Sequence, residues 1–528
     1  MRSTSARRSR GILTALIVAA ASIAPLTVAD VASAPAASAA GVTISGTGSS
    51  YAAIAINTWV SQMFTTYGTS INYQSSSSVQ GLENFANGLV DFGASEIGYS
   101  TGQAQSTPPA SEHYQYLPDI AGATCIMYNV LGSTGQPITE LRVNSSILAG
   151  IFTGKILKWN DPQITALNPG VLLPNTPLIV TYRADPAGEN YIFSDYLKTL
   201  EPGTWGAFSS AMGYPNAPTA IWPTPTTGGT SAGGFNEGNW VAQNGSDNAS
   251  NYVSSSLNTM TYVEAGYALE HNIPCAYVEN ASGSFVRPSE LADAIALTND
   301  QLQANLEQDL TGVYNAPQPG AYPISAYSYL VTGSDGLNPA KGAALSQFVV
   351  FLACQGQQAA GTLGYSPLPN NLVQADFDAV NRMAGHIATP PLDAAHCPNP
   401  YITGQLQSVG EPPILGQPGG GYTGGAAAGA GAGSGAGLAN SAASKTGTGG
   451  GPAVLKGIKA GKGGLAAAGQ TPGVALSTAS AYLLGLSGPT WSMIGWTLAF
   501  IALLALPPLG LVLIRRRRLR PETVEVDQ

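Results

Sequence analysis

Residues 177–197 read PLIVTYRADPAGENYIFSDYL and combine the features that specify the architecture of the chain. The run PLIVTYR is rich in β-branched and aromatic residues, which predicts a strand ending at Arg183. The small and turn-forming residues of ADPAGE follow, and NYIFSDYL then shows helical spacing. A strand, a loop of small residues and a helix form the repeating unit of α/β proteins.

The same unit occurs twice earlier in the chain. Residues 42–67 contain a short strand, the loop GTGSSY and the apolar-periodic stretch AAIAINTWVSQMFTTY. Residues 70–88 contain SINYQ, a run of serines and VQGLENFANG. We therefore expect an α/β fold with largely parallel sheets over residues 41–416, a length sufficient for two lobes.

The charge of the chain is unevenly distributed. The 528 residues carry a formal net charge of −9, with 21 Lys and Arg against 30 Asp and Glu. Within residues 41–416 there are eight basic and twenty-six acidic residues, a net charge of −18. Nucleic-acid binding depends mainly on Lys and Arg, so we expect no nucleic-acid partner. An anionic ligand has to be bound by local donors.

The two ends predict an exported protein that is held at the membrane. Residues 1–40 resemble a signal peptide, because the basic MRSTSARRSR precedes an apolar run and small residues that end in Ala37-Ser38-Ala39. Residues 491–514 contain no charge over a length that suits a transmembrane helix. Four arginines follow at once, which predicts that the tail, residues 515–528, is cytoplasmic.

A segment rich in Gly, Ala and Ser, residues 417–490, lies before the predicted span and contains no acidic residue. Such a composition buries too little apolar surface to fold, so we predict a flexible linker. The predicted organisation is thus a signal peptide, an extracytoplasmic two-lobed solute-binding domain, a linker, a single transmembrane helix in the cell membrane and a short tail.

Four cysteines in an exported chain suggest up to two disulfides. We favour Cys354 with Cys397, because this pair would fix the segment LDAAHCPNP to a predicted helix. Cys125 and Cys275 lie in apolar, strand-like runs, where a disulfide and two buried thiols are both consistent with the sequence. The Cys and His spacings do not indicate a metal site, and no cofactor is expected.

Each of the three loops between a predicted strand and helix can present donors to an anion. Unpaired backbone N–H groups and the positive end of a helix dipole lie at such a position. The first loop contains Ser49 and Ser50, and the second contains Ser78 at a predicted N-cap. Arg183 precedes the third loop, and Asp185 in that loop is close enough to orient the guanidinium of Arg183. Any one loop is weak evidence, since a serine before a helix is usually only a cap. Three loops together, one with an arginine, predict an oxyanion site.

Long motifs then occur in a particular order: GTGSSY, INYQSSSSVQGLENFANGLVDFGASEIGYS, LAGIFTGKILKWNDPQITALNPGVLLP, YRADPAGENYIFSDYL, TYVEAGYALEHNIP and LGYSPLP. This order resembles that of the phosphate-binding proteins of ABC-type phosphate importers, the PstS family, over nearly all of residues 42–373. The resemblance implies a type II periplasmic-binding-protein fold, in which two lobes joined by crossing strands close on a tetrahedral oxyanion. It also implies delivery of inorganic phosphate or another small oxyanion to an ABC permease.

The resemblance further implies a set of ligand-binding residues, namely Ser50, Tyr51, Ser78, Glu96, Arg183, Ala187, Gly188 and Glu189. Three of these differ from the usual family pattern. Glu96 stands where the family has Asp, and Ala187 and Glu189 stand where the family has Ser and Thr. The site therefore lacks two hydroxyl donors and contains an additional carboxylate.

The additional carboxylate has a large electrostatic effect if it is ionised and faces the ligand. Two unit charges about 4 Å apart interact by roughly 4 kcal/mol at an effective dielectric constant of 20. A micromolar ligand binds with only about 8 kcal/mol. Three arrangements are consistent with the sequence: Glu189 points into solvent, Glu189 is protonated, or Glu189 pairs with Arg183 in place of an external anion.

The sequence thus predicts a solute-binding protein for phosphate or a related oxyanion. A membrane-tethered surface protein of the same fold, with a lost or altered anion site, is the alternative. An enzyme ranks last, because we find no GxSxG, HExxH or P-loop motif. Trp59, Trp159 and Trp222 are expected to pack in the core or at a lobe surface and not to form a ligand platform. Residues 228–253 resemble a loop insertion without an assigned role.

Overall fold

The structure is a computed structural model that describes residues 41–110, 113–224, 239–406 and 408–416, all within one compact unit. The predicted signal peptide, linker, transmembrane helix and tail therefore lie outside the described residues, as do residues 228–238 of the predicted loop insertion. Among the residues that are described, no helix is both long enough and apolar enough to span a membrane.

One eight-stranded mixed sheet runs through this unit in the order β2-β1-β3-β11-β4-β8-β6-β7. The strands are β1 (Thr43–Gly48), β2 (Ser70–Ser75), β3 (Phe92–Ser95), β4 (Tyr114–Asn129), β6 (Ile179–Arg183), β7 (Trp240–Gln243), β8 (Thr259–Glu264) and β11 (Ser325–Gly333). A smaller sheet in the order β10-β9-β5 contains β5 (Arg142–Val143), β9 (Tyr277–Glu279) and β10 (Phe285–Val286).

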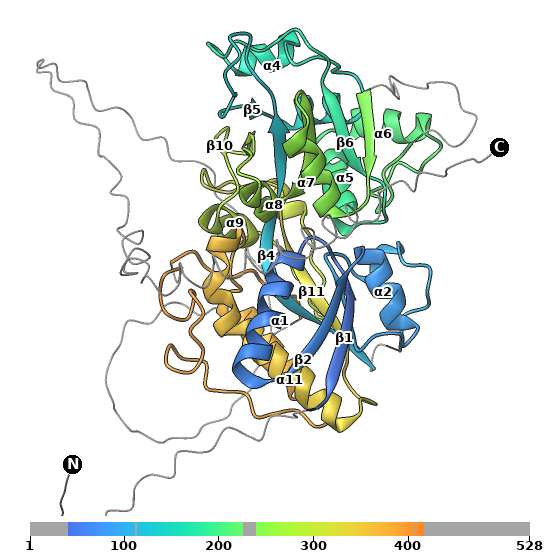
Figure 1. Ribbon diagram of the computed structural model, residues 1–528, viewed down its shortest axis with the longest axis vertical. Helices are drawn as coiled ribbons and strands as arrows, with labels where there is room; N and C mark the ends of the chain where they lie inside the picture. The colour runs from blue at the N-terminus through green and yellow to red at the C-terminus, as the bar shows by residue number, and fades with distance from the viewer. Residues whose placement is uncertain (1–40, 111–112, 225–238, 407, 417–528) are drawn as a thin grey trace, which may run out of the picture. The chain divides into compact units, whose positions relative to one another are not determined.

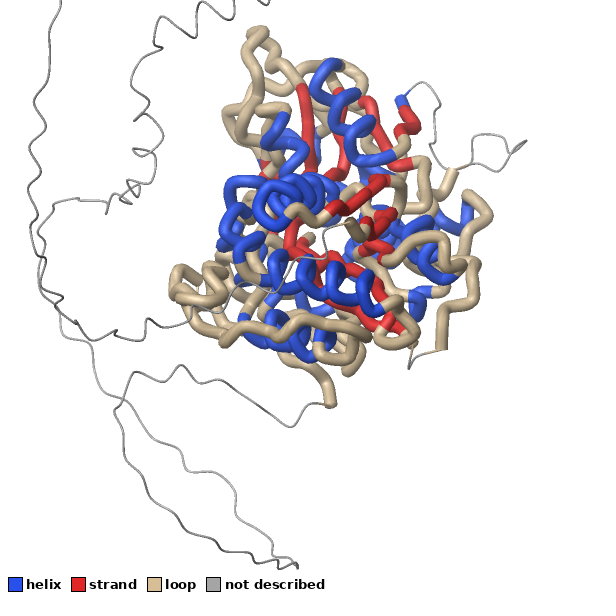
Figure 2. The backbone as a smooth tube through the Cα atoms, turned by 60° about the horizontal axis from the view of Figure 1, so that its bottom comes forward, coloured by secondary structure: helices blue, strands red, loops and turns tan. Residues whose placement is uncertain are grey.

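Two lobes form around the two ends of the large sheet (Figure 1). The first lobe contains β1, β2 and β3 with the helices α1 (Ala53–Tyr67), α2 (Ser78–Ala86), α11 (Pro339–Ala353) and α12 (Asn370–Val380). The second contains β6, β7 and β8 with the helices α3 (Ser145–Phe152), α4 (Pro162–Leu167), α5 (Gly188–Leu200), α6 (Pro202–Ala211), α7 (Gly245–Ser255) and α8 (Ala265–Glu270). In both lobes helices lie beside the strands (Figure 2). The predicted α/β architecture is confirmed.

Strands β4 and β11 connect the lobes. Along its first part β4 pairs antiparallel with β11, and from Thr124 to Asn129 it pairs with β8 of the second lobe. β11 also pairs with β3 of the first lobe. Two short helices, α9 (Glu290–Leu297) and α10 (Thr311–Tyr314), precede β11. The chain thus crosses to the second lobe in β4 and returns in β11, so the predicted crossing strands are present.

Aromatic side chains of α5 and β8 form the hydrophobic core beside β6. Phe193 of α5 stacks on Tyr262 of β8 with their ring centroids 4.6 Å apart, and Trp222 packs against both rings. Trp59, Trp159 and Trp222 are fully buried, so of the two expected positions they take the core. This packing holds β6, α5 and β8 together directly beneath Arg183.

Two disulfides are present in the described residues. Cys354 at the end of α11 is bonded to Cys397, the pair that the sequence favours. Cys125 of β4 is bonded to Cys275, so the alternative of two buried thiols does not apply. The first disulfide joins the segment after α12 to the first lobe, and the second lies within the second lobe.

Candidate functional site

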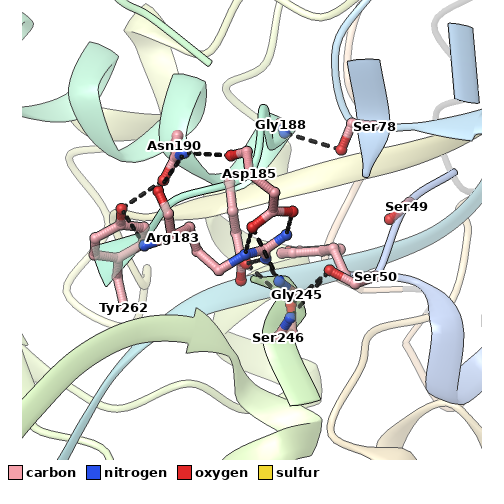
Figure 3. Close-up of polar contacts among 12 residues, drawn as sticks. Ser49, Ser50, Ser78, Arg183, Asp185, Gly188, Asn190, Gly245, Ser246 and Tyr262 are labelled. Atoms are coloured by element: carbon pink, nitrogen blue, oxygen red, sulfur yellow. Dashed lines mark hydrogen bonds and ion pairs between the residues drawn. The ribbon is translucent and has the colours of Figure 1, made fainter. Parts of the chain in front are cut away.

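Four helices of the two lobes begin at one place, close to Arg183 (Figure 3). They are α1 and α2 of the first lobe, and α5 and α7 of the second. Each follows a strand or a short loop at the end of a strand, which is how parallel α/β units bring their helix N-termini to one edge of a sheet. The unpaired N–H groups and dipoles of these helices favour negative charge at this point.

The first lobe contributes what we call the first wall, made of Ser49, Ser78 and Glu96. The hydroxyl of Ser49 donates to Oε1 of Glu96, and Oγ of Ser78 donates to Oε2 of Glu96 at 2.5 Å. Glu96 is 1 % exposed. Burial raises the pKa of its carboxyl group, and the two hydroxyl donors only partly offset this effect.

Gly48, at the end of β1, permits the turn that places Ser49. Its φ of 138° lies in a region that side-chain-bearing residues rarely adopt, and a Cβ atom would collide with the backbone of Ala94. The loop GTGSSY therefore approaches β3, and the hydroxyl of Ser49 reaches the carboxylate that follows β3.

The second lobe contributes the second wall, made of Arg183, Asp185, Glu189 and Ser246. Nε of Arg183 donates to Oδ1 of Asp185 at 2.7 Å, and Nη2 donates to the other oxygen. Nη1 of Arg183 donates to Oε2 of Glu189 at 2.7 Å and to Oγ of Ser246 at 2.9 Å. The guanidinium is 1 % exposed, and groups of its own chain accept its hydrogen bonds on several sides.

Hydrogen bonds with Tyr262 and Asn190 fix the backbone at the end of β6. The backbone N–H of Arg183 donates to the hydroxyl of Tyr262 at 3.2 Å. The side-chain amide of Asn190 donates to the carbonyl oxygens of Arg183, Asp185 and Ala220. These contacts hold the loop between β6 and α5 rigid, so the guanidinium has a defined direction.

Two carboxylates on the same guanidinium differ in pKa. Burial would raise the pKa of Asp185, but the hydrogen bonds and charge of Arg183 outweigh it and hold this pKa below its usual value. Burial raises the pKa of Glu189 to about 7, in spite of the attraction of Arg183 and with a further contribution from Glu96. The charge of Arg183 is therefore already neutralised by Asp185, and Glu189 is only weakly stabilised as an anion.

The two walls touch each other. The hydroxyl groups of Ser50 and Ser246 are 2.9 Å apart, and the N–H of Ser246 donates to Oγ of Ser50 at 3.2 Å. The N–H of Gly188 donates to Oγ of Ser78 at 2.9 Å. A Cβ atom at residue 188 would collide with the carboxylate of Glu96, so only glycine permits this approach.

The structure brings most of the predicted site residues into this cluster, namely Ser50, Ser78, Glu96, Arg183, Gly188 and Glu189. Tyr51 is buried and packs against Tyr365, and its hydroxyl has no hydrogen-bond partner within the part of the chain that is described. The N–H of Ala187 donates to the carbonyl of Ala220 at 2.9 Å, so its backbone donor is already engaged.

Two predictions about this region are wrong. The N-cap of α2 is Ser77, whose side chain accepts a hydrogen bond from the N–H of Gln80, whereas Ser78 is the first helical residue. As a consequence Ser78 Oγ is free to reach Glu96. The described part of residues 228–253 is also more than a loop, because it contains β7 and most of α7.

Ser246 was missed by sequence reasoning. It lies 63 residues after Arg183 in the chain and still accepts a hydrogen bond from its Nη1. Gly245 beside it donates its N–H to Oδ1 of Asp185 at 2.9 Å. The available signal was the pattern WVAQNGSDNASNYV, in which a short apolar run and Asn-Gly-Ser precede helical spacing.

A cavity of about 220 Å³ lies beside the cluster, between the lobes. Glu96 and Gly98 line it from the first lobe, and Tyr191 and Asp195 line it from the second. Within the described ranges, no group of three or more His, Cys, Asp or Glu residues could hold a metal ion. The arrangement can bind a small polar group through hydroxyls and one guanidinium.

Comparison with known proteins agrees with this geometry. A family model described as a PBP superfamily domain matches residues 33–355, which is more than half of the chain. The phosphate-binding protein PstS of Xylella fastidiosa, strain Temecula1, is 30 % identical over 334 residues, which cover 63 % of this chain and 83 % of that protein. PstS of Methanocaldococcus jannaschii is 28 % identical over 351 residues, which cover 64 % and 85 %.

A solved structure shares the fold. A high-affinity periplasmic phosphate-binding protein, PfluDING, has a TM-score of 0.50 and 17 % identity, with coverage of 66 % of this chain and all of that one. The two-lobed sheet, the crossing strands and the match over residues 33–355 therefore lead to one assignment. The chain belongs to the periplasmic-binding-protein superfamily and, within it, to the PstS family of phosphate-binding proteins.

Proposed function

We propose that the chain captures phosphate or a related small oxyanion outside the cytoplasm and delivers it to an ABC importer. One observation carries this proposal: Arg183, the hydroxyls of four serines and the N-termini of four helices converge between two lobes. The relatives named above are phosphate-binding proteins. The proposed ligand-binding residues are Ser50, Ser78, Glu96, Arg183, Gly188 and Glu189, together with Ser49 and Ser246.

The proposal includes the mode of attachment and of action. A type II binding-protein domain, residues 41–416, is held at the membrane by one helix at residues 491–514, with the domain on the outer side. The protein binds and releases its ligand without covalent chemistry. Its functional partner is an ABC permease.

A titration of the full chain with inorganic phosphate tests this function. We expect saturable binding with one site per chain. Calorimetry or the intrinsic fluorescence of the tryptophans detects this binding. The lack of any signal at millimolar phosphate, at every pH from 5.5 to 8.5, would overturn the proposal.

One observation favours a second candidate, a tethered surface protein whose anion site is lost or altered. Nη1 of Arg183 already donates a hydrogen bond to Oε2 of Glu189 at 2.7 Å, and this donor would otherwise be available to an external anion. The triple variant with Ala187→Ser, Glu189→Thr and Glu96→Asp separates the two candidates. Phosphate binding by the triple variant alone supports this second candidate, and binding by the natural chain excludes it.

A further inference from the structure

The carboxyl group of Glu189 has two oxygens in very different surroundings. Oε2 accepts hydrogen bonds from Nη1 of Arg183 at 2.7 Å and from the hydroxyl of Ser246 at 3.2 Å. Oε1 is fully buried and has no hydrogen-bond partner among the described residues. The side chain as a whole is 1 % exposed. A buried carboxylate with one unpaired oxygen is unfavourable, and a proton on that oxygen removes the charge.

Arg183 does not remove this cost. Asp185 already accepts hydrogen bonds from its Nε and Nη2, which gives the guanidinium a bidentate counter-ion before Glu189 is considered. Glu96 contributes another negative charge, and its carboxylate lies next to Gly188, the residue that precedes Glu189. The cluster thus contains three carboxylates and one cation when all are ionised.

Within the described part of the chain, the other titratable groups that interact with Glu189 are acids or tyrosines, apart from Arg183. The titratable groups that act on it or are acted on by it are Arg183 and Asp185 at the end of β6, Glu96 after β3, Tyr51 before α1, Tyr262 and Glu264 in β8, and Tyr267 in α8. Burial raises the pKa of Glu189 to about 7 in this setting. The group is therefore divided between its two forms near neutral pH.

A protonated carboxyl group differs from a carboxylate in one useful respect, because it carries an O–H donor. The resemblance to the PstS family implies Thr at this position, and the hydroxyl of Thr is also a donor. The unpartnered Oε1 is the atom that can carry this proton, since Oε2 already accepts from Arg183 and Ser246. Glu189 can thus replace the missing hydroxyl only in its protonated form.

We propose that Glu189 takes up a proton when the anion binds, and that the O–H group of the protonated Glu189 donates a hydrogen bond to the anion. In the free protein Glu189 accepts from Nη1 of Arg183. On binding, the anion takes over Nη1, and the protonated Glu189 becomes one of its donors. Binding is thereby coupled to the uptake of one proton at this residue. The inference rests on the proposed function, because it names how the same site binds its anion.

The sign of the pH dependence follows from the coupling. Above the pKa of about 7 the free protein has to be protonated before it binds, so the apparent affinity falls by about tenfold for each pH unit. Below this pH, Glu189 is already protonated, and its contribution to the pH dependence disappears. Phosphate also exchanges a proton near neutral pH, so the contribution of Glu189 has to be obtained as a difference between variants.

Calorimetric titration of the full chain with inorganic phosphate, in buffers of different ionisation enthalpy, counts the protons taken up on binding. The variants are Glu189→Gln, which is isosteric and keeps an N–H donor, and Glu189→Thr, which has the hydroxyl of the family pattern. Glu290→Gln is the matched control, since Glu290 is a half-buried carboxylate with a raised pKa on α9 that is not part of the cluster. Thermal unfolding of each variant verifies that it is folded.

We expect the natural chain to take up about one proton more than Glu189→Gln at pH 8 and about the same number at pH 6. At pH 8, Glu189→Gln and Glu189→Thr bind phosphate about tenfold more tightly than the natural chain, and Glu290→Gln binds as the natural chain does. Equal proton uptake by the natural chain and Glu189→Gln at pH 8, with phosphate bound by both, overturns the inference and leaves the proposed function intact. If neither the natural chain nor Glu189→Thr binds phosphate at any pH, the proposed function fails instead.

Discussion

The two walls of the cluster hold buried carboxylates in opposite ways. In the first wall, two neutral hydroxyls from Ser49 and Ser78 converge on one carboxylate, Glu96. In the second wall, two carboxylates, Asp185 and Glu189, converge on one cation, Arg183. Glu96 thus receives hydrogen bonds from two side-chain hydroxyls and from no cation, whereas Arg183 is bonded by two acidic side chains.

This difference shows that proximity to an arginine does not by itself keep a carboxylate charged. Asp185 accepts from two nitrogens of Arg183 and has a lowered pKa, whereas Glu189 accepts from one and has a raised pKa. Glu96 accepts from two hydroxyls and from its own backbone N–H, and burial nevertheless raises its pKa. Asp185 and Glu189 differ in burial and in the number of donors that each accepts from, and these differences set their pKa values apart.

Replacing the cation of the second wall has the largest expected effect. Arg183→Gln removes the cation that contacts the proposed ligand, so phosphate affinity falls by at least about 100-fold. It also leaves two buried carboxylates without their counter-ion, which destabilises the fold by about 3–5 kcal/mol at neutral pH. Calorimetry and thermal unfolding measure the two effects.

Arg142→Gln is the control for this experiment, because Arg142 is an exposed arginine of the same lobe that stacks on Phe285. It should leave phosphate binding unchanged. An affinity of Arg183→Gln within threefold of the natural chain would show that the second wall is not where the anion binds.

Neutralising the first wall changes selectivity. Ionised Glu96 accepts hydrogen bonds and donates none, so in this form it favours a ligand that carries a proton, such as phosphate, over sulfate, which carries none. Glu96→Gln introduces a donor, and we expect the preference for phosphate over sulfate to fall by about 10- to 100-fold. Competition titrations measure this ratio.

Asp195→Asn is the matched control for Glu96→Gln. Asp195 lines the same neighbouring cavity and also has a raised pKa, caused mainly by burial, but it does not contact the cluster. An unchanged ratio in Glu96→Gln, together with intact phosphate binding, contradicts the role of Glu96 as the residue that detects the ligand's proton.

The buried carboxyl group of Asp119, which lies in the field of Glu96, should make the free energy of unfolding depend on pH. Asp119 of β4 is fully buried, and neither of its oxygens has a hydrogen-bond partner in the described ranges. Burial, with a contribution from Glu96, raises its pKa to about 8. The folded state therefore binds more protons than the unfolded state between about pH 4 and pH 8, and the stability falls as the pH rises through this interval.

Asp119→Asn removes this dependence. We expect the variant to be more stable than the natural chain by about 1–3 kcal/mol at pH 8 and nearly equal to it at pH 4. Urea unfolding at both values measures the difference, with Asp378→Asn on the exposed face of α12 as control. A variant that is less stable at pH 8 would mean that Asp119 is ionised and stabilised in the folded protein.

The contact between the walls gives the smallest effect. Ser246→Ala removes a hydroxyl that bonds to Arg183, Glu189 and Ser50, and one such group contributes about 1 kcal/mol. Phosphate affinity should fall by about fivefold. Ser250→Ala on the same helix should have no effect, because the Ser250 hydroxyl bonds within α7. Equal affinities of Ser246→Ala and the natural chain would place the ligand away from α7.

Much of this arrangement could be predicted from the sequence, because it depends on local order. A strand followed by a loop of small residues and a helix places Ser50 and Ser78 near helix starts, and Arg183 at the strand end before another helix, whatever the remaining chain does. The exact cap of α2 could not be predicted, since Ser75 to Ser78 are four equivalent residues, and only the contacts of the folded lobe distinguish Ser77 from Ser78.

Other parts depend on contacts between distant segments. Ser246 reaches the cluster because β7 pairs parallel with β6, and this pairing is not encoded in the composition of residues 239–253. The direction of Glu189 depends on Ser246 and on the charge already shared by Asp185. Sequence patterns could therefore state three arrangements for Glu189 (pointing into solvent, protonated, or paired with Arg183), but not select one.

The continuous sheet also limits how the two lobes can separate. Residues 114–123 of β4 pair with residues 325–333 of β11, with a register shift between Ser328 and Tyr329. A rotation that opens the cluster has to bend this two-stranded ribbon, which acts as an elastic hinge with a restoring torque. The axis of such a rotation is then set by the ribbon.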